Sequence, residues 1–225
     1  LAKAFSTYDE DKKNVLFASG VSNSSETKLS EFSRERELII NIFDSMQKEA
    51  LFVYFSTCSV HDTYFSKNDY TKHKLEMEKL VLLKSDNYLI VRLPQVVGNS
   101  KNKKLLINFL WDSICRNKKF TLYDIERNII DVEDVVKIVE YFINKTKLRN
   151  QTITIANLYN IKVIDIVKTI EDLLSKKAIY EVKRLDGAFI LDTSIMKRYC
   201  PELVLFDPQY VKHVLKKYFK KGEKC

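Results

Sequence analysis

Tyr70 and Lys74 are the side chains of this sequence whose types and spacing are best suited to chemistry. A phenol and an ammonium four residues apart on a helix project from one face and can share one small site. The ammonium stabilises the phenolate, so we expect Lys74 to lower the pKa of Tyr70 from its ordinary value of about 10. Such a tyrosine can pass a proton to or from a hydroxyl group while a hydride moves at the same carbon.

The spacing becomes informative through what precedes it in the chain. Tyr8 and Tyr141 are also followed by a lysine four residues later, but their surroundings indicate a solvated turn and a packed helix, respectively. Tyr70 alone lies thirteen residues after an apolar segment that ends in hydroxyl groups, residues 52–57. We therefore take Tyr70 as the candidate proton donor or acceptor.

Strands and helices alternate along the chain and must position these residues. Short apolar runs predict strands over residues 14–19, 51–55, 88–93, 120–123 and 152–156. Helical spacing of apolar residues predicts helices over residues 29–48, 69–83, 105–116, 133–145, 162–176 and 208–219. This order predicts an α/β fold with a mostly parallel sheet covered by helices on both faces. Gly20, Thr57 and Pro94 each follow a strand, and ligands of such sheets gather at the carboxyl ends.

The length and the net charge of the chain limit the number of domains and the kinds of partner to be expected. The 225 residues suit one α/β domain, with or without a small appendage. No run of 18 or more apolar residues occurs, so we expect no membrane-spanning helix and no membrane partner. The net charge of +8 favours anionic partners. Nucleic-acid binding rests on this charge alone, because no helix-turn-helix, zinc or stacking-aromatic motif supports it, and we expect no nucleic-acid partner.

The cysteines and histidines indicate neither a metal site nor a disulfide framework. The three histidines are scattered, and the four cysteines have no spacing typical of metal ligands: Cys58, Cys115, Cys200 and Cys225. Cysteines used in this way are typical of a reducing compartment, so we expect a cytoplasmic location and no bound metal.

Four segments, spread over most of the chain, resemble motifs of the extended short-chain dehydrogenase/reductase family. Residues 70–78 are similar to the family's Tyr-x-x-x-Lys followed four residues later by Glu, and Ser56-Thr57 resembles the hydroxyl pair that closes the preceding strand. Residues 92–98 resemble Arg-x-Pro-Asn-Val-Tyr-Gly, and residues 131–135 resemble a late Val-x-Asp-Val element. The family comprises NAD-dependent nucleotide-sugar epimerases, dehydratases and ketoreductases with a Rossmann-like sheet.

The resemblance implies roles for the candidate residues. Tyr70 would be the general acid or base, Lys74 would hold the nicotinamide ribose, and Thr57 would hydrogen-bond the reacting sugar oxygen. The alternative for Thr57 is a hydroxyl that caps the end of its strand. The implied cofactor is NAD or NADP, lined by Ala18, Ser19, Gly20, Tyr70, Lys74 and Pro94.

The resemblance also implies contacts with a nucleotide-sugar substrate. Gln95 stands where the family often has a substrate-binding asparagine, and Thr57 would also contact the substrate. Arg127 aligns with an arginine that clamps the diphosphate, and a guanidinium fork matches phosphate oxygens. A surface arginine without a ligand is the alternative for Arg127. The family also implies a homodimer, for which the helices over residues 29–48 and 69–83 are the candidate contacts.

The family's glycine-rich phosphate loop has no counterpart here. The chain has only Gly20, Gly98, Gly187 and Gly222, and it begins at Leu1 rather than Met. We expect this sequence to leave out the glycine-rich segment, with its true loss as the alternative. The implied division is a Rossmann-like cofactor domain over residues 1–100 with parts of 120–160, incomplete at its N-terminus. Residues 101–120 and 157–225 would form a smaller substrate-binding region.

Other departures from the family's motifs limit which of its reactions can be expected. Cys58-Ser59 stands where 4,6-dehydratases carry Asp-Glu, so elimination of water is not expected. Glu35 or Arg36 falls where a helix asparagine often supports proton transfer. The leading hypothesis is an NAD(P)-dependent 4-ketoreductase or 4-epimerase of a nucleotide-linked hexose. A non-catalytic family member that serves as a binding or assembly module is the alternative.

Overall fold

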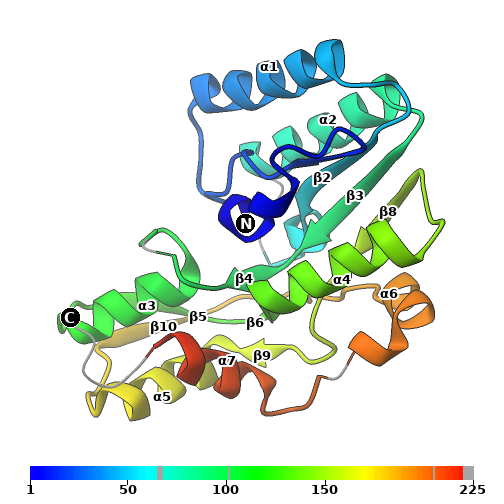
Figure 1. Ribbon diagram of the computed structural model, residues 1–225. Helices are drawn as coiled ribbons and strands as arrows, with labels where there is room; N and C mark the ends of the chain where they lie inside the picture. The colour runs from blue at the N-terminus through cyan, green and yellow to red at the C-terminus, as the bar shows by residue number, and fades with distance from the viewer. Residues whose placement is uncertain (65–67, 101, 205, 220–225) are drawn as a thin grey trace.

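A four-stranded parallel sheet forms the centre of the upper part of the molecule in Figure 1. The computed structural model describes residues 1–64, 68–100, 102–204 and 206–219. The strand order is β1 (Asn14–Phe17), β2 (Leu51–Thr57), β3 (Tyr88–Leu93) and β8 (Gln151–Thr154), with β1 at one edge. The register places Phe17 opposite Tyr54, and Ser56 opposite Arg92, so the carboxyl ends of the strands share one edge.

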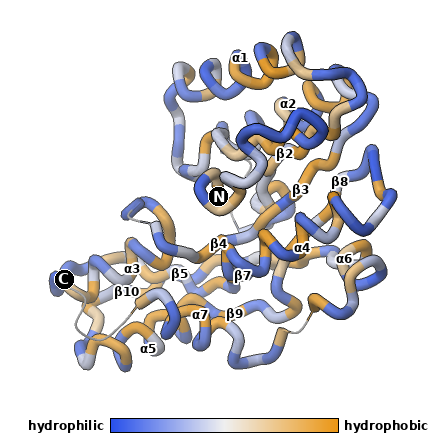
Figure 2. The backbone as a smooth tube through the Cα atoms, viewed as in Figure 1, coloured by the Kyte–Doolittle hydropathy of each residue, from blue (hydrophilic) through white to orange (hydrophobic). Residues whose placement is uncertain are grey.

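Helices cover both faces of this sheet, because successive residues of the strands point to opposite faces and are apolar on both. Phe52 and Tyr54 of β2 pack against α1 (Leu29–Ser45) and α2 (Asp69–Lys84). Val53 and Phe55 point the other way, toward α4 (Val132–Lys145) and the 3-10 helix η1 (Ala2–Tyr8). Figure 2 shows the resulting hydrophobic strands between helices of mixed polarity. A strand that is buried on both faces consists of an almost continuous run of apolar residues, and β2 has such a sequence.

Two helices that matter for the site begin at side-chain caps. The Asn68 side chain accepts a hydrogen bond from the Thr71 amide at the start of α2, and Asp131 accepts one from the Glu133 amide at the start of α4. The Asn68 cap places Tyr70 in the first turn of α2. Lys74 follows one turn later on the same buried side.

The remaining elements build a second hydrophobic core in the lower part of Figure 1. Its helices are α3 (Leu106–Cys115), α5 (Val163–Leu174) and α7 (Tyr210–Tyr218), which pack with the parallel strands β5 (Phe120–Asp124) and β10 (Tyr180–Arg184). Two further strand pairs are β4 (Gln95–Val97) with β7 (Ile129–Asp131) and β6 (Glu126–Arg127) with β9 (Ile161–Lys162). The last elements are α6 (Ser194–Tyr199) and the 3-10 turns Cys58–His61 and Pro201–Leu203.

The predicted fold class is confirmed, and the differences lie in short elements. The long strands and helices appear within a few residues of their expected bounds. The strands β4, β6, β7 and β9 were not predicted from the sequence, because two or three residues show no recognisable hydrophobic periodicity. The mostly exposed strand β10 and the six-residue helix α6 were not predicted either. The assignment of the two cores to cofactor and substrate remains a prediction.

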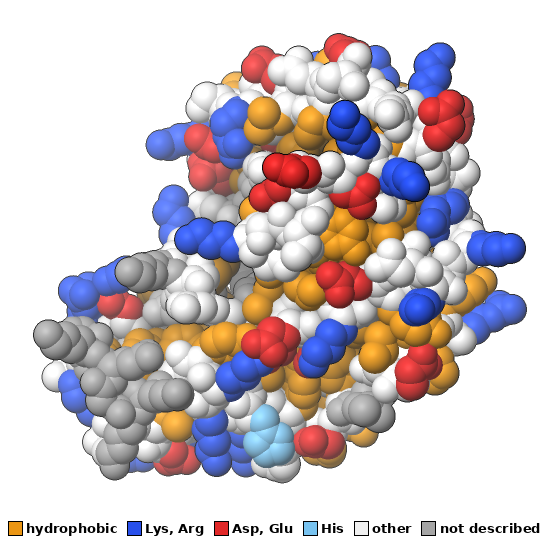
Figure 3. Space-filling model, viewed as in Figure 1, with side chains coloured by type: hydrophobic (Ala, Val, Ile, Leu, Met, Phe, Trp, Pro, Cys, Tyr) orange, Lys and Arg blue, Asp and Glu red, His pale blue; other side chains and the backbone are white. Residues whose placement is uncertain are grey.

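The surface carries charges of both signs, and one cysteine departs from the sequence-based expectation. On the face shown in Figure 3, lysine and arginine side chains alternate with carboxylates rather than gather in one patch. Within the described ranges, no helix has the length and apolar character needed to cross a membrane. Cys58 and Cys200 are buried free thiols, as expected. Cys115 is disulfide-bonded, so the expectation that the cysteines form no disulfide is wrong for this residue. Cys225 lies outside the described residues.

Truncation of the sheet core provides a test of the fold. Leu89 of β3 is 1% exposed, whereas Ile190, in the loop after β10, is 78% exposed. We expect Leu89→Ala to lower the free energy of unfolding by about 2–5 kcal/mol, because it removes buried surface and leaves a cavity. Ile190→Ala is the exposed control, and it should change the free energy of unfolding by less than about 0.5 kcal/mol. Urea denaturation measures both, and equal effects of the two substitutions would contradict this packing.

Candidate active site

Tyr70 and Thr57 meet at the carboxyl end of β2. Both side chains are buried, and the Tyr70 ring packs against Val21 and Phe32. The Tyr70 hydroxyl interacts with the Thr57 side chain, whose oxygen also accepts a hydrogen bond from the Ser59 amide at 3.1 Å. The structure thus brings together a phenol and a hydroxyl that lie thirteen residues apart in the chain.

The protonation of Tyr70 differs from the sequence-based expectation. Burial raises the pKa of Tyr70 to about 12, the Thr57 hydroxyl opposes this, and the Glu35 charge adds to it. The expectation that Lys74 would lower the pKa of Tyr70 is therefore wrong for this arrangement. The physical reason is that a buried phenolate is poorly solvated, while the Lys74 ammonium is matched by a carboxylate.

Lys74 is held in a buried ion pair with Glu35. Its Nζ lies 2.9 Å from Glu35 Oε1 and donates a hydrogen bond of 3.2 Å to the Tyr54 hydroxyl. The side chains of Lys74 and Glu35 are 3% and 0% exposed, respectively. Burial lowers the pKa of Lys74, and the adjacent Glu35 carboxylate counteracts this, so the two groups are best described as one charged pair.

Glu35 accepts hydrogen bonds from several elements at once. Its Oε2 receives the Val21 amide at 2.7 Å and lies 3.0 Å from His73 Nε2, and its Oε1 receives the Tyr54 hydroxyl at 2.8 Å. Burial by itself would raise the pKa of Glu35. The hydrogen bond with His73, the Lys74 charge and the Val21 amide outweigh burial and lower it to about 2. A buried carboxylate with these partners is fixed in its charged form.

Gly20 lies directly against this charged pair. A Cβ built at Gly20 would be 2.5 Å from Glu35 Oε1 and 2.9 Å from Lys74 Nζ. The segment after β1 can therefore approach the pair only because this residue has no side chain. Ala18 and Ser19 precede Gly20, and the Ser19 carbonyl accepts a hydrogen bond of 3.4 Å from Arg34.

A second polar group ties two of the family-like motifs together. Arg92 of β3 binds Glu78 of α2 through two contacts, Nε to Oε1 at 3.0 Å and NH2 to Oε2 at 2.6 Å. Ser56 donates to the same Glu78 carboxylate, and Arg92 NH1 lies 2.9 Å from His61 Nε2. Such a bidentate pair fixes α2 against the strand ends, and so fixes the height of Tyr70 above them.

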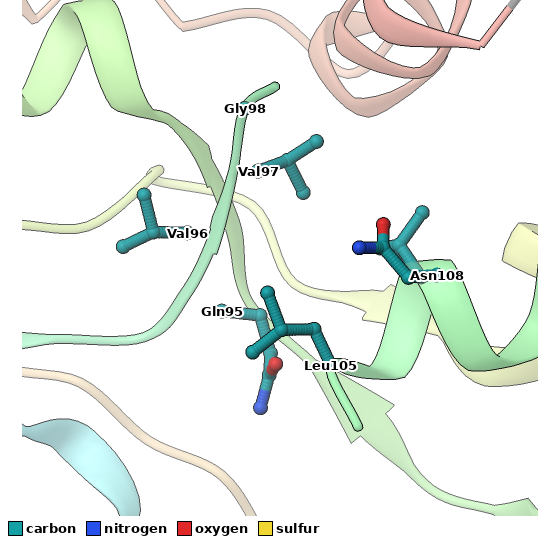
Figure 4. A pocket seen from close by; sticks show the side chains of 7 residues that line it. Gln95, Val96, Val97, Gly98, Leu105 and Asn108 are labelled. Carbon is teal, nitrogen blue, oxygen red and sulfur yellow. The ribbon is translucent and has the colours of Figure 1, made fainter. Parts of the chain in front are cut away.

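Pro94 and Gln95 follow directly after β3, at the carboxyl edge of the sheet. Pro94 separates β3 from β4, and Gln95 is the first residue of β4. Figure 4 shows the Val96 and Val97 side chains on opposite sides of this segment. Gln95, Leu105 and Asn108 are among the residues that line a cavity of about 10 Å³, room for about one water molecule. That cavity is too small for a sugar.

Arg127 contacts a different set of groups from Tyr70 and Lys74. Its NH1 lies 3.1 Å from Asp62 Oδ2, and the two side chains are 11% and 10% exposed. Its guanidinium carbon lies 5.8 Å from the Tyr64 ring centre and 5.5 Å from that of Phe189. Burial lowers the pKa of Arg127, and the Asp62 charge opposes this. Arg127 is thus a partly buried member of an ion pair rather than a surface side chain.

Most of the polar groups around Lys74 were not predicted from the sequence. Glu35 was noted only as occupying the place of an asparagine, and Tyr54 and His73 were given no role. A signal was present: Phe32, Glu35 and Ile39 share the buried face of α1, so a carboxylate interrupts an apolar stripe at helical spacing. A buried carboxylate requires donors, and that requirement predicts polar partners nearby.

Comparison with known proteins identifies the fold. No protein-family model and no curated protein sequence matches the chain. Among solved structures, UDP-glucuronic acid 4-epimerase from Bacillus cereus, in complex with UDP-glucuronic acid and NAD, superposes with a TM-score of 0.74 at 15% identity, over 96% of this chain and 77% of that one. dTDP-glucose 4,6-dehydratase from Bacillus anthracis, in complex with NAD, superposes with a TM-score of 0.68 at 13% identity, over 96% and 76%.

A third structure extends the likeness to a protein with the other nicotinamide cofactor. The protein named RMD from Pseudomonas aeruginosa, complexed with NADPH, superposes with a TM-score of 0.69 at 14% identity, over 92% of this chain and 81% of that one. At these identities the likeness shows a shared fold. The fold expected from the resemblance to extended short-chain dehydrogenases/reductases is therefore confirmed.

Removal of the Glu35 charge tests the buried pair. The pKa of Glu35 is lowered from 4.5 to about 2, so its contribution to stability, about 3 kcal/mol, is present above pH 4.5 and is lost as the pH falls toward 2. We expect Glu35→Gln to destabilise the protein by about 3 kcal/mol at neutral pH, because it leaves the Lys74 ammonium buried without a counter-charge. The variant should also lose much of the stability change between about pH 4.5 and 2.

Glu31→Gln is the matched control, since Glu31 lies on the same helix in an exposed pair with Arg34 at 3.2 Å. It should cost less than about 1 kcal/mol and leave the acid dependence unchanged. Urea denaturation at a series of pH values measures both variants. A Glu35→Gln protein with the acid dependence of the wild type would show that the pair is not charged.

Proposed function

We propose that this protein is an NAD(P)-dependent oxidoreductase that acts at C4 of a nucleotide-linked hexose, as a 4-ketoreductase or a 4-epimerase. The observation that carries the proposal is the meeting of Thr57, Tyr70 and the buried Lys74 pair at the carboxyl edge of the sheet. Ligands of parallel α/β sheets bind at that edge. The shared fold with enzymes whose structures contain NAD and a UDP-sugar supports the same assignment.

The residues around Lys74 fit one part of a nicotinamide nucleotide. An ammonium has three N–H donors, and the described contacts of Lys74 use two of them, on Glu35 and Tyr54. The remaining donor is the group that would hold a ribose hydroxyl beside Gly20. Ala18, Ser19 and Pro94 lie at the same strand ends. When bound, the nicotinamide would supply or accept the hydride.

Tyr70 would hold and move the proton in this reaction. A carbonyl oxygen at C4 would accept hydrogen bonds from Tyr70 and Thr57, so that its lone pairs are aligned before the hydride arrives. As negative charge develops on that oxygen, the Tyr70 phenol would donate its proton. The Ser59 amide, which donates to Thr57, orients the Thr57 hydroxyl toward the phenol.

The protonation of Tyr70 favours the reductive direction. Because the pKa of Tyr70 is about 12, the phenol keeps its proton at neutral pH and is ready to act as an acid. A 4-epimerase has to remove a proton from a hydroxyl first, and this requires a base. Of the two activities, we therefore favour the 4-ketoreductase.

Gln95 and Arg127 complete the proposal on the substrate side. Arg127 would bind the diphosphate of the nucleotide sugar, and Gln95 would reach the sugar from the start of β4. We further propose a cytoplasmic homodimer formed through α1 and α2. Leu29 and Leu83 of these helices are 78% and 84% exposed, as an apolar contact surface requires.

A binding or assembly module without catalysis is the second candidate. It is favoured by the engagement of Lys74 with Glu35. This candidate predicts no binding of NADH or NADPH. Titration of the protein with each nucleotide, followed by fluorescence, separates the two candidates.

Substitution of the phenol tests the catalytic role. With UDP-, dTDP- or GDP-linked 4-keto sugars, we expect consumption of NADH or NADPH in step with substrate. We expect Tyr70→Phe to lower kcat by about 10²–10⁴-fold, because it removes the proton donor and keeps the ring. Tyr141→Phe is the matched control, since Tyr141 has the same spacing to a lysine and lies on α4 away from the site. Equal activity of the two variants would overturn the role of Tyr70.

The pH dependence tests the acid role separately. Because Tyr70 stays protonated below its pKa of about 12, reduction should be nearly constant between about pH 6 and 9. Oxidation of the product alcohol with NAD(P)⁺ should increase with pH over the same range, because it needs the deprotonated phenol. Initial rates in both directions, with stability checked at each pH, provide the measurement. A reductive rate that falls steeply across neutral pH would contradict a phenol that holds its proton.

A further inference from the structure

The Asp62–Arg127 ion pair lies under a cover made by two distant segments of the chain. Residues 62–64 follow the turn after β2, and residues 187–190 follow β10. The Thr63 amide donates to the Ala188 carbonyl at 3.3 Å, and the Ala188 amide donates to the Thr63 hydroxyl at 2.7 Å. A Cβ at Gly187 would lie 2.8 Å from the Tyr64 amide nitrogen, so the two backbones are in close contact.

The Asp62 carboxylate is fixed before any ligand binds. Its Oδ1 accepts the Tyr64 amide at 2.9 Å within the same loop, and its Oδ2 lies 3.1 Å from Arg127 NH1. Asn160 donates to the Phe189 carbonyl at 2.6 Å and so holds the second segment in place. The guanidinium is thus contacted by a carboxylate and by the rings of Tyr64 and Phe189.

A carboxylate oxygen and a phosphate oxygen bind a guanidinium in the same way. Both accept charge-assisted N–H bonds, and both benefit from a site with little water. A diphosphate carries more negative charge and more acceptor oxygens than one aspartate, so it can displace the aspartate. A nucleoside or a free sugar has no comparable charge and cannot do so.

We propose that Asp62 is a built-in competitor that occupies the Arg127 guanidinium until the diphosphate of a nucleotide-linked sugar displaces it. The inference rests on the proposed function, because it takes Arg127 as the diphosphate site. Asp62 then determines specificity: only ligands with a diphosphate release the carboxylate and open the contact between residues 62–64 and 187–190. Asp62 lies five residues after Thr57, so its release also reaches the loop that follows the catalytic hydroxyl.

Isothermal titration calorimetry of the full chain with inorganic pyrophosphate, UDP and uridine tests this. We expect Asp62→Asn to bind pyrophosphate and UDP about tenfold more tightly than the wild type, because the competing charge is gone. Uridine binding should not change. Asp62→Ser is a second variant that removes the charge and keeps an acceptor for the Tyr64 amide, and it should show the same gain.

Two controls separate competition from a general effect of charge. Asp112 lies on α3 and forms ion pairs with Lys103 and Arg116. Asp112→Asn removes one negative charge there and should leave the affinities for pyrophosphate and UDP unchanged. In an Arg127→Ala background, Asp62→Asn should give no gain. Unchanged or weaker binding by folded Asp62→Asn and Asp62→Ser, a gain that persists without Arg127, or no binding of pyrophosphate and UDP by any variant would each overturn the inference.

The outcomes are distinguishable from a failure of the proposed function. A tenfold gain in Asp62→Asn without NAD(P)H-dependent turnover would support the competitor and contradict the oxidoreductase. Turnover in the wild type without any gain in Asp62→Asn or Asp62→Ser would support the oxidoreductase and contradict the competitor.

Discussion

The need to satisfy one buried carboxylate organises this end of the molecule. Glu35 of α1 is 0% exposed, and its donors come from the segment after β1, from β2 and from α2. An isolated charge at this depth costs far more than a protein domain can sustain, so these elements have to converge on it. The convergence places Lys74 beneath the strand ends and leaves Tyr70, one helical turn earlier, beside Thr57. Because a Cβ at Gly20 would collide with the pair, the segment after β1 is part of the same arrangement.

In the proposed active site, the same carboxylate would determine which direction of proton transfer is favoured. An unbalanced ammonium beside a phenol would stabilise the phenolate and make a base available. Here Glu35 balances Lys74, and burial keeps the proton on Tyr70. Under the proposed function, the site would therefore give a proton to a developing alkoxide more readily than it would remove one from an alcohol. A second balanced charge, Asp62 on Arg127, would regulate the diphosphate end in the same way. At both ends of the proposed site, a cationic side chain is thus paired with a carboxylate of the protein itself.

Much of the fold and part of the site could be predicted from the sequence because the strongest patterns are local. The apolar runs of β2 and β3 and the helical spacing of α1 and α2 required no tertiary information. The grouping of Thr57 with Tyr70 followed from strand ends and from the resemblance to a known family. The ionic partners could not be predicted in this way. Glu35 and Lys74 are 39 residues apart in the sequence, and nothing in that spacing indicates a contact. Only the packing of α1 against α2 shows which carboxylate pairs with which cation. The pKa of Tyr70 differs from the sequence-based expectation because neither the burial of the phenol nor the counter-charge of the neighbouring ammonium can be read from the sequence.

The central claim is that burial, reinforced by the Glu35 charge, keeps the proton on Tyr70. Nuclear magnetic resonance of ring-labelled tyrosines, with Tyr70 assigned by its loss in Tyr70→Phe, measures this protonation directly across a pH titration. The account predicts that Tyr70 in the wild type remains protonated beyond the ordinary tyrosine pKa of about 10, and that the pKa of Tyr70 falls in Glu35→Gln. A wild-type Tyr70 that titrates well below pH 10, or one whose pKa does not move when the Glu35 charge is removed, would contradict it.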